Sequence, residues 1–520
     1  MTVATWLRRC ETWFPERTAI VAGSASLSYA EFGRRSNQHA NGLAALGLRP
    51  GDRVAVVTEN SIPAVEALAA CAKGGFVHVP ISFRLTPREV VQIIGHSECR
   101  VLLAESHHAD RLQDALRACP SLQRIIRFAP DPREPGEYAD WLAQHSQADP
   151  DADVTLEHDL VICYTSGTTG APKGVLHKHR QIVAHAPVTA MYYGIDGDSR
   201  LLMVYPHNSI ASIAMFYTPA WMVGATVVIS DAQRFSAERW LSEVEAHRIT
   251  HCHLVPTMLF RVLSSDDLAR RDVSSLQTIG YGSAPMPRPQ VDRLCQVFGN
   301  ILVHGYGMTE ITSLATVLTK ADHRAALEGD DRRLVSCGRP VFGVELRVVD
   351  EEDRDVPPGG VGEIIMRGAQ MTSGYWNDQA RTDQAIRGGW LHSGDIARLD
   401  ADGYVTIVDR KSDIIISGGV NIASREVEEV ISWLEGVSEV AVIGKPDAEW
   451  GERVHAFVVE QPGAGLSPER IIAFCRERLA GFKCPEAVEI TEDLPRNALG
   501  KVMKSQLRTR ARMKEASSHV

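Results

Sequence analysis

Apolar runs and amphipathic stretches alternate along the chain from Thr18 to Ser230. Short apolar segments such as 53–57 have the length and the β-branched content of buried strands. Between them lie stretches of helical period, such as Tyr29 to Leu46, which Gly47 would close. This alternation predicts βαβ units, in which parallel sheets are covered by helices, and therefore an α/β fold.

The same pattern resumes from Arg248 to Leu318, where 277–281 is a predicted strand, and it changes after Val335. Shorter strands and Gly/Pro turns follow. The run 357–360, Pro-Pro-Gly-Gly, is a turn signal before the apolar segment 362–366. We predict a β-rich subdomain in this part of the chain.

Beyond Lys411 the predicted elements are of mixed type. They are a strand at 413–417, a helix at 424–434, strands at 437–443 and 455–459, and a helix at 467–479. This order predicts a compact α+β domain, small and separate from the rest of the chain.

Composition narrows the class of protein. A chain of 520 residues with a formal charge of −10 and no run of membrane-spanning length is typical of a globular, cytoplasmic protein, and the charge argues against a nucleic-acid binder. Residues 1–14 interleave apolar and charged positions, which favours an amphipathic helix over a signal peptide. The ten cysteines lack Cys-x-x-Cys spacing, which predicts reduced, packed thiols, and His-Cys-His at 251–253 lacks the further ligands of a zinc site.

Candidate chemistry concentrates in the stretch from Tyr164 to Gly174, which follows the apolar segment 160–163. Its glycines let backbone N–H groups approach phosphate oxygens, and its hydroxyl groups and Lys173 add donors and positive charge. A flexible linker is the alternative, but linkers rarely carry a lysine. Walker A loops need Gly-Lys followed by Ser or Thr, whereas Pro172 precedes Lys173 here. The stretch therefore predicts a polyphosphate cradle of another kind.

Four further motifs follow this loop in order. They are Gly305-Tyr306-Gly307-Met308-Thr309-Glu310, then Gly389-Trp390-Leu391-His392-Ser393-Gly394-Asp395, then Asp409-Arg410-Lys411-Ser412-Asp413 with Gly418-Gly419-Val420-Asn421-Ile422, and last Pro495-Arg496-Asn497-Ala498-Leu499-Gly500-Lys501. Together the five motifs resemble those of the adenylate-forming superfamily, which includes acyl-CoA synthetases, nonribosomal-peptide adenylation domains and beetle luciferases. They span most of the chain.

The resemblance implies a domain organisation. A large N-terminal domain, residues 1–410, would bind AMP and the acyl group on helix-covered sheets and the β-rich subdomain. A small C-terminal domain, residues 411–520, would rotate between two catalytic poses. Ser412 is the hinge residue by position, although the family more often has Asp or Lys there.

The resemblance also implies an ATP site. Its predicted residues are Thr165, Ser166, Gly167, Thr168, Thr169, Gly170, Lys173, Gly282, Ser283, Ala284, Pro285, Tyr306, Asp395 and Arg410. Glu310 would coordinate Mg²⁺, which prefers oxygen ligands, and Thr309 would contact the α-phosphate. Lys501 would be the lysine that bridges the acid and the α-phosphate during adenylation. A capping turn for Thr309 and Glu310, a core aromatic for Tyr306 and a solvated surface lysine are the alternatives without function.

The acyl and thiol sites are predicted in the same way. His207 resembles the family's aromatic gate near the carboxylate, and Gly307 stands where acetate-activating relatives have tryptophan, so it is expected to leave space for a larger acid. Ile210, Ala211, Met215 and Met308 are apolar candidates for lining this pocket. No aspartate near 207–209 could pair with a substrate ammonium, which favours a plain acid over an amino acid. Gly418 and Gly419 would admit the pantetheine arm of CoA.

The resulting hypothesis is an ATP-dependent, AMP-forming acyl-CoA synthetase that acts on a medium-chain, alicyclic or aromatic acid. A ligase that loads a carrier-protein pantetheine is the alternative, and a nucleotide-binding sensor without turnover is a hypothesis of another class. The predicted cofactor is Mg²⁺, and the predicted partners are the acid, ATP and CoA. A homodimer and a lysine acetyltransferase acting on Lys501 are further hypotheses.

Overall fold

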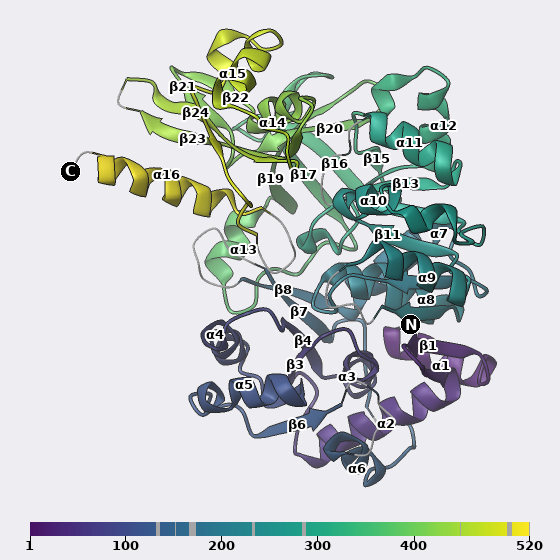
Figure 1. Cartoon of the computed structure of the whole chain (residues 1–520). Coiled ribbons are helices and arrows are strands. Elements are labelled where there is room, and N and C mark those ends of the chain that lie inside the picture. The colour runs from purple at the N-terminus through teal and green to yellow at the C-terminus, as the bar shows by residue number, and fades with distance from the viewer. Residues whose placement is uncertain are drawn as a thin grey trace. The chain divides into compact units, whose positions relative to one another are not determined.

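The computed structural model spans residues 1–520 (Figure 1). It describes residues 1–129, 131, 136–150, 152–165, 173–230, 235–282, 286, 288–447, 449–496 and 502–518, with the backbone alone at 331 and 512–518. Residue contacts group the chain into two units. Unit 1 comprises Met1–Leu346 and Met366–Leu391, and unit 2 comprises Arg347–Ile365 and His392–Val520. The boundary expected between residues 410 and 411 lies inside unit 2 in this grouping and stays a prediction.

A six-stranded sheet in unit 1 has the strand order β6-β5-β3-β4-β7-β8. Its strands are β3 (Arg53–Thr58), β4 (Val77–Ser82), β5 (Val101–Glu105), β6 (Arg124–Phe128), β7 (Asp159–Thr165) and β8 (Lys173–Lys178). All pairs are parallel except β7 with β8. From β3 the chain continues to β4 on one side, and from β5 it continues to β6 on the other, so the topological switch point lies between β3 and β5.

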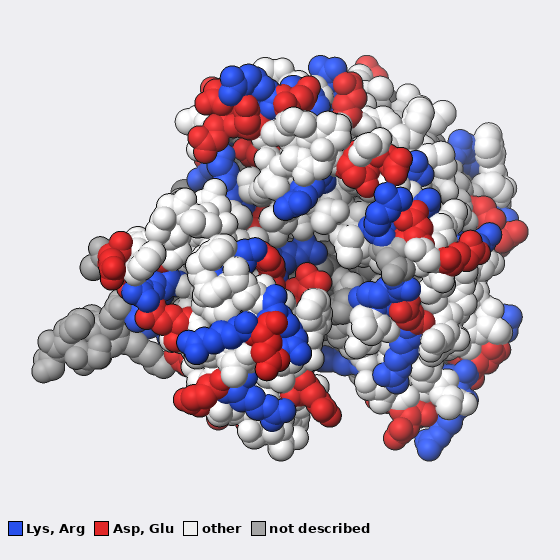
Figure 2. Space-filling view, turned by 90° about the horizontal axis from the view of Figure 1, so that it is seen from above, with Lys and Arg blue, Asp and Glu red and all other residues white. Residues whose placement is uncertain are grey.

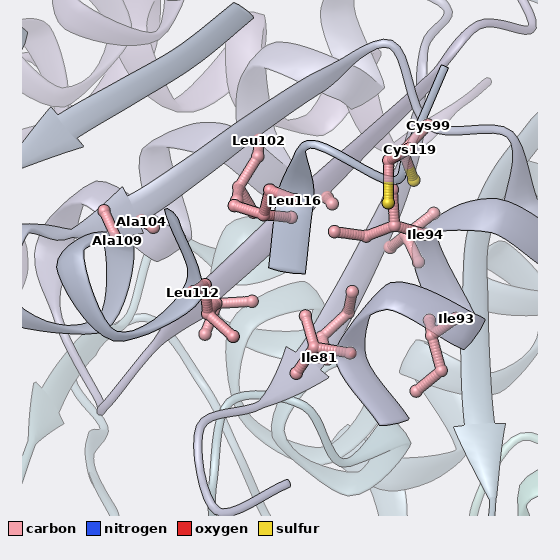
Figure 3. Packing of buried hydrophobic residues seen from close by; sticks show 14 of the residues in the cluster. Ile81, Ile93, Ile94, Cys99, Leu102, Ala104, Ala109, Leu112, Leu116 and Cys119 are labelled. Atoms are coloured by element: carbon pink, nitrogen blue, oxygen red, sulfur yellow. The ribbon is translucent and has the colours of Figure 1, made fainter. Parts of the chain in front are cut away.

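Different helices cover the two faces of this sheet. They are α4 (Pro87–Ser97) and α5 (Ser106–Leu116) on one face, and α2 (Tyr29–Ala45), α3 (Ile62–Gly74) and α6 (Glu137–Ala143) on the other. Along β3, Ala55 and Val57 join the first core and Val54 and Val56 the second. Figure 3 shows the first core, where Leu112 of α5 lies among apolar side chains of the sheet and of α4. Each fully buried aliphatic side chain contributes about 1.5–3 kcal/mol. The predicted helix-covered parallel sheet is confirmed.

A nine-stranded sheet, also in unit 1, has the order β15-β14-β13-β12-β11-β9-β10-β1-β2. Its strands are β1 (Thr18–Ala22), β2 (Ala25–Ser28), β9 (Arg200–Met203), β10 (Thr226–Ile229), β11 (His251–Leu254), β12 (Thr278–Gly282), β13 (Leu302–Tyr306), β14 (Thr316–Leu318) and β15 (Arg339–Pro340). The remaining helices of this part are α1 (Val3–Trp13), α7 (His179–Tyr193), α8 (Thr218–Val223), α9 (Ala237–His247), α10 (Pro256–Leu263), α11 (Arg288–Phe298), α12 (Lys320–Leu327) and a π-helix at Ser212–Tyr217. The amphipathic helix predicted within residues 1–14 is α1, which Thr2 caps and which buries Trp6 and Leu7.

The predicted β-rich part forms a five-stranded sheet with the order β16-β17-β19-β18, in which β20 also pairs with β19. Its elements are β16 (Val344–Val349), β17 (Val361–Gly368), α13 (Gln379–Ala385), β18 (Ile386–Arg387), β19 (Trp390–Leu399) and β20 (Val405–Arg410). The turn expected at 357–360 is present, because Gly360 N donates to Pro357 O (2.7 Å) and Gly359 has a φ of +79°.

The α+β part beyond Lys411 forms a further five-stranded sheet, with the order β22-β21-β24-β23 and β25 on β24. Its elements are β21 (Ile415–Ser417), β22 (Val420–Ile422), α14 (Ser424–Ser432), β23 (Val437–Asp447), β24 (Gly451–Glu460), α15 (Pro468–Arg476), β25 (Ala487–Ile490) and α16 (Lys504–Ser518). The predicted α+β composition is confirmed. Two short strands, β22 and β25, were not predicted, since neither has enough residues to show a period.

Surface charge is mixed on the face shown in Figure 2, where acidic and basic side chains are interspersed. None of the described helices combines the length and the apolar character that crossing a membrane requires. Eight of the ten cysteines are buried and all ten are free thiols, as the packed-thiol prediction expected.

Candidate functional site

The predicted phosphate loop connects two antiparallel strands of unit 1. β7 ends at Thr165, β8 begins at Lys173, and these two residues are paired across the ladder. The predicted contacts Ser166, Gly167, Thr168, Thr169 and Gly170 lie between them, outside the described residues. A Walker A loop leads from a strand into a helix. This loop returns as a strand, so Lys173 stands at its base and not at a helix N-terminus.

The segment 372–376 lies against β8. Trp376 N donates to Gly174 O (2.8 Å), and Leu176 N donates to Gly374 O (3.0 Å). A Cβ at Gly174 would lie 2.8 Å from the Ile162 side chain, so only glycine fits there without a shift. These contacts hold the segment beside the strand that begins at Lys173.

The same segment holds Glu310 at two points. Thr372 N donates to the Glu310 carbonyl (2.8 Å), and the Tyr375 hydroxyl donates to Glu310 Oε1 (2.8 Å). Burial, and secondly the Glu310 charge, raise the pKa of Tyr375, so its hydroxyl stays a donor at neutral pH. Glu310 is therefore fixed relative to the strand that carries Lys173. Sequence reasoning did not find Tyr375, because the two residues are 65 positions apart.

The Glu310 carboxylate suits a hard cation. Glu310 is 8% exposed. Within the described part of the chain, no Lys, Arg or His forms an ion pair with its carboxylate. The hydroxyl of Tyr375 orients one oxygen without neutralising the charge. Proteins bind Mg²⁺ through one or two such carboxylates together with substrate phosphates. Thr309, half-buried beside Glu310, begins the same 3-10 turn, Thr309–Ile311.

Strained backbone begins two residues after Glu310. Thr312 and Ser313 have φ values of +55° and +85°, a region that costs non-glycine residues about 1–3 kcal/mol each. The buried Gln370 holds this turn, since its side-chain amide N–H donates to the carbonyls of Ile311 (3.3 Å) and Leu314, and its main-chain carbonyl accepts from Thr312 Oγ1 (2.5 Å). Backbone strain that surrounding contacts maintain is typical of functional sites.

The structure corrects the reasoning about Gly307. A Cβ at this position would lie 1.8 Å from Ser313 O and 2.6 Å from Ser313 C. The glycine was expected to leave space in the acyl pocket, but the strained turn occupies the direction that a side chain would take. The residue is therefore glycine because backbone approaches closely here, and its identity no longer indicates the size of the acid. The half-buried Met308 precedes the same turn.

The predicted adenine edge lies at the carboxyl ends of β12 and β13. Gly282 and Gly305 are paired across these parallel strands, and a Cβ at Gly282 would lie 2.3 Å from Gly305 O. Tyr306 ends β13 and is half-buried. Parallel strands present their carboxyl ends at one edge, where α/β proteins bind ligands. The structure thus brings Gly282 and Tyr306 together, while Ser283, Ala284 and Pro285 lie outside the described residues.

His207 is held by a residue that sequence reasoning missed. Asn60, in the loop after β3, accepts from His207 N (2.9 Å) and donates to Tyr205 O (2.8 Å). One amide therefore fixes the backbone on both sides of Pro206. His207 is 3% exposed, and its Nε2 has no hydrogen-bond partner among the described residues. A substrate carboxylate or a water could be that partner.

We expect the activity to show no histidine titration from His207 near pH 6.5. Burial lowers the pKa of His207 to about 4, against a smaller opposing effect of a backbone hydrogen bond to Thr58. The imidazole is therefore neutral above this value and gains its proton only as the pH falls through about 4. Initial rates of pyrophosphate release from about pH 5 to about pH 8 test this. An acid limb near pH 6.5 that disappears in His207→Gln would contradict it.

The apolar acyl candidates are buried on neighbouring segments. Ile210 and Met215 are each 6% exposed, whereas Ala211 is half-buried. Sequence reasoning missed a polar pair in the same unit, in which the Tyr205 hydroxyl and His253 Nδ1 are 2.7 Å apart. His253 of the His-Cys-His motif at 251–253 therefore has a hydrogen-bond partner and does not require a metal.

The predicted ribose contacts are neighbours in unit 2. Asp395 and Arg410 are paired across β19 and β20, and Arg410 Nε lies 2.8 Å from Asp395 Oδ1. The Asp395 side chain is 4% exposed and that of Arg410 is 44% exposed. Asp395 N also donates to Ser393 Oγ (3.0 Å). Sheet register thus brings together two residues that the sequence separates into different motifs.

We expect Asp395→Asn to raise the KM for ATP about tenfold and to leave the KM for the acid within about twofold, because hydrogen bonds to a charged group contribute about 1.5 kcal/mol. Steady-state pyrophosphate release with each substrate varied in turn separates the two constants. The matched control is Asp402→Asn, an exposed turn residue of the same unit. Equal increases in both constants would indicate that Asp395 is structural only.

Gly418 and Gly419 form the turn of the β21–β22 hairpin. Their φ values of +56° and +79° match the two-residue turns that require glycine-like residues. Gly418 N donates to Trp450 O (2.8 Å), and a Cβ at Gly418 would lie 2.7 Å from the Trp450 ring. Hairpin geometry alone therefore accounts for both glycines, and their contact with CoA stays a prediction.

The predicted hinge is in contact with α16. Arg508 Nη2 donates to Ser412 O (2.9 Å) and to Asp413 Oδ1 (2.8 Å). The adjacent Lys411 pairs with Glu363 (3.2 Å). Lys501 lies outside the described residues, and its rotation with the domain and its role stay predictions.

These features define an adenylate-forming enzyme, with a buried carboxylate tied to the strand behind a glycine-rich loop and with the superfamily's motifs in order. The chain belongs to the AMP-binding enzyme family. The family described as AMP-binding enzyme matches residues 7–376, and its C-terminal domain family matches residues 426–501.

Relatives of the chain are ligases. Feruloyl-CoA synthase of an Amycolatopsis species is 36% identical over 508 residues, which cover 98% of this chain and 99% of that protein. The fatty acid–[acyl-carrier-protein] ligase ScoC of Streptomyces coeruleorubidus is 35% identical and covers 95% and 94%. The crystal structure of the anthranilate CoA ligase AuaEII with anthranoyl-AMP superposes with a TM-score of 0.90 at 26% identity, over 99% and 98% of the two chains.

Proposed function

We propose that the enzyme activates a carboxylic acid with ATP and Mg²⁺ to an acyl-adenylate and transfers the acyl group to CoA. The observation that carries this proposal is the Glu310 carboxylate, which Tyr375 and Thr372 hold beside the strand of Lys173. A carboxylate in that place would bind the cation that neutralises the phosphates as pyrophosphate leaves. The predicted domains 1–410 and 411–520 belong to the same proposal.

The acid is proposed to be larger than acetate, and medium-chain, alicyclic and aromatic acids are the classes to test. Two of the relatives are named for aromatic acids, ferulate and anthranilate. The buried Ile210 and Met215 would contribute apolar surface for such an acid. Gly307 does not indicate the size of the acid, so the choice among these classes depends on the relatives. Their names favour an aromatic acid.

A carrier-protein pantetheine is the second candidate acceptor. It is favoured by one observation, the 35% identity to ScoC, which is named for transfer to an acyl-carrier protein. Both acceptors present the same phosphopantetheine thiol, so Gly418 and Gly419 do not distinguish them.

The deciding experiment measures pyrophosphate and AMP release over a panel of straight-chain, alicyclic and aromatic acids, each without acceptor, with CoA, and with a phosphopantetheinylated carrier protein. We expect one group of acids to turn over repeatedly only with CoA. Multiple turnovers only with the carrier protein would support the second candidate, and no pyrophosphate release with any acid would overturn the proposal in favour of a nucleotide sensor.

Three minor parts of the proposal concern the setting of the enzyme. A cytoplasmic location fits its substrates, ATP and CoA, and a homodimer is to be tested by light scattering. Acetylation of Lys501 would remove the charge that adenylation needs, so a lysine acetyltransferase would silence the enzyme. Intact-peptide mass spectrometry of the native protein tests that modification.

A further inference from the structure

Three potential metal ligands meet in unit 1. Glu59, His107 and His108 each offer one ligand atom, and these atoms all lie within 4.8 Å of one another. Glu59 follows β3 directly, and the two histidines lie in the first turn of α5, directly after β5. None of the residues assigned to the adenylation site is among them.

The fold places this cluster where α/β proteins bind ligands. β3 and β5 are adjacent and parallel, and the switch point of the sheet lies between them. The helices that follow the two strands, α3 and α5, pack on opposite faces of the sheet. At such a switch point α/β folds typically form a ligand-binding crevice outside the carboxyl ends of the strands. All three ligands stand at the carboxyl ends of these two strands, Glu59 directly after β3 and the two histidines in the first turn of α5.

His108 supplies an independent indication of a missing partner. The residue is 6% exposed, and its Nε2 has no hydrogen-bond partner among the described residues. Buried imidazole nitrogens normally bind a partner, so this one lacks an explanation within the fold. A neutral imidazole carries a free lone pair on one ring nitrogen, which can bind a metal ion.

A second carboxylate, that of Glu105, lies beside the His107 ring. Glu105 Oε1 lies 3.5 Å from His107 Nδ1, and its Oε2 accepts from Thr58 Oγ1 (3.0 Å). Metal-bound histidines usually have such a carboxylate on the other ring nitrogen, where it fixes the tautomer. Because Thr58 immediately precedes Glu59 and Glu105 lies two residues before His107, this bond also ties together the strand ends that carry the ligands. Glu59 and Glu105 would balance the charge of a divalent ion.

We propose that Glu59, His107 and His108, none of which is assigned to adenylation, bind a divalent transition-metal ion, of which Zn²⁺ is the probe to test. Two imidazoles and one carboxylate are a ligand set of zinc sites, whereas Mg²⁺ prefers oxygen ligands alone. Bonds of about 2.0–2.1 Å to a tetrahedral ion place the ligand atoms about 3.4 Å apart, and the three ligand atoms here lie within 4.8 Å of one another. The exposed His107 has room for the side-chain rotation that would adjust these separations on binding.

The test uses the full-length enzyme after treatment with a chelator. Zn²⁺ is titrated in competition with a chromophoric chelator, and Co²⁺ is added separately because the intensity of its visible absorption distinguishes a four-coordinate protein site from the hydrated ion. We expect one equivalent of Zn²⁺ to bind at micromolar concentration or below. The double variant His107→Ala/His108→Ala should lose this equivalent, and Glu105→Gln should weaken it by about 10- to 100-fold.

The matched control is His158→Ala/His247→Ala, which removes two partly buried imidazoles that belong to no such cluster in the described structure. It should bind Zn²⁺ like the wild-type protein. Thermal unfolding without metal verifies that each variant is folded, and Glu59→Gln offers a milder change if the histidine variant is not. Equal binding by the wild type and the His107/His108 variant, or no binding by the wild type below about 100 μM, would overturn the proposal.

Discussion

Glu310→Gln should lower kcat/KM for pyrophosphate release at least about 100-fold and should raise the Mg²⁺ concentration that gives half-maximal rate. The substitution keeps the shape of the side chain but removes the charge that would bind the cation, and removal of a single group that stabilises charge in a transition state typically costs about 10²- to 10³-fold. The measurement is a Mg²⁺ titration of the initial rate at saturating ATP and acid. An unchanged Mg²⁺ dependence would exclude Glu310 as a metal ligand.

Tyr375→Phe tests whether Tyr375 orients the Glu310 carboxylate. It removes only the hydroxyl that donates to Glu310 Oε1, and a hydrogen bond to a charged group contributes about 1.5–3 kcal/mol, so we expect a loss of about tenfold or more. In the Glu310→Gln background the same change should cost much less, because the charged acceptor is gone. Additive losses would show that the two residues act independently.

The matched control for this cycle is Tyr192→Phe. Tyr192 is a partly buried residue of the same unit, and its hydroxyl accepts from Phe342 N (3.3 Å). Its removal should leave the Mg²⁺ dependence unchanged. Thermal unfolding of all variants distinguishes a lost contact from a misfolded protein.

Local signals predicted most of the fold. The alternation of short apolar segments with helical stretches indicated the helix-covered parallel sheet, because burial on both faces of β3 requires apolar residues at 54–57. Turn chemistry indicated the Pro-Pro-Gly-Gly turn. The short strands β22 and β25 escaped prediction, since three or four residues show no period and only pairing with β21 and β24 defines them.

The site was predictable where one residue type has one chemical role. Asp395 and Arg410 were assigned from separate motifs, and sheet register pairs them. Residues that act through tertiary contacts gave no local signal. Asn60 reaches His207 across 147 positions, and Tyr375 reaches Glu310 across 65. Gly307 shows why a residue type can mislead. A glycine in the sequence can mark either an open space or a close approach of backbone, and only the structure shows that the backbone of Ser313 is close here.

The largest expected effect belongs to Lys501→Ala. We expect adenylate formation to fall about 10³-fold, while thioester formation from supplied acyl-adenylate stays within a few-fold of the wild type. Negative charge shifts toward pyrophosphate only in the first half reaction, so a lysine that bridges the acid and the α-phosphate would stabilise that transition state alone. Pyrophosphate exchange reports the first half reaction, and CoA-dependent consumption of synthetic acyl-adenylate reports the second.

Lys504→Ala is the control that makes this separation meaningful. Its ammonium lies 2.7 Å from Glu428 and 2.6 Å from Ser424 Oγ, so its loss leaves a partly buried carboxylate without its cation and lowers the free energy of unfolding by about 1.5–3 kcal/mol. A lysine that matters only for stability affects both half reactions through the amount of folded enzyme. If Lys501→Ala impaired both halves equally at unchanged stability, the C-terminal domain would not use separate poses for adenylation and thioester formation.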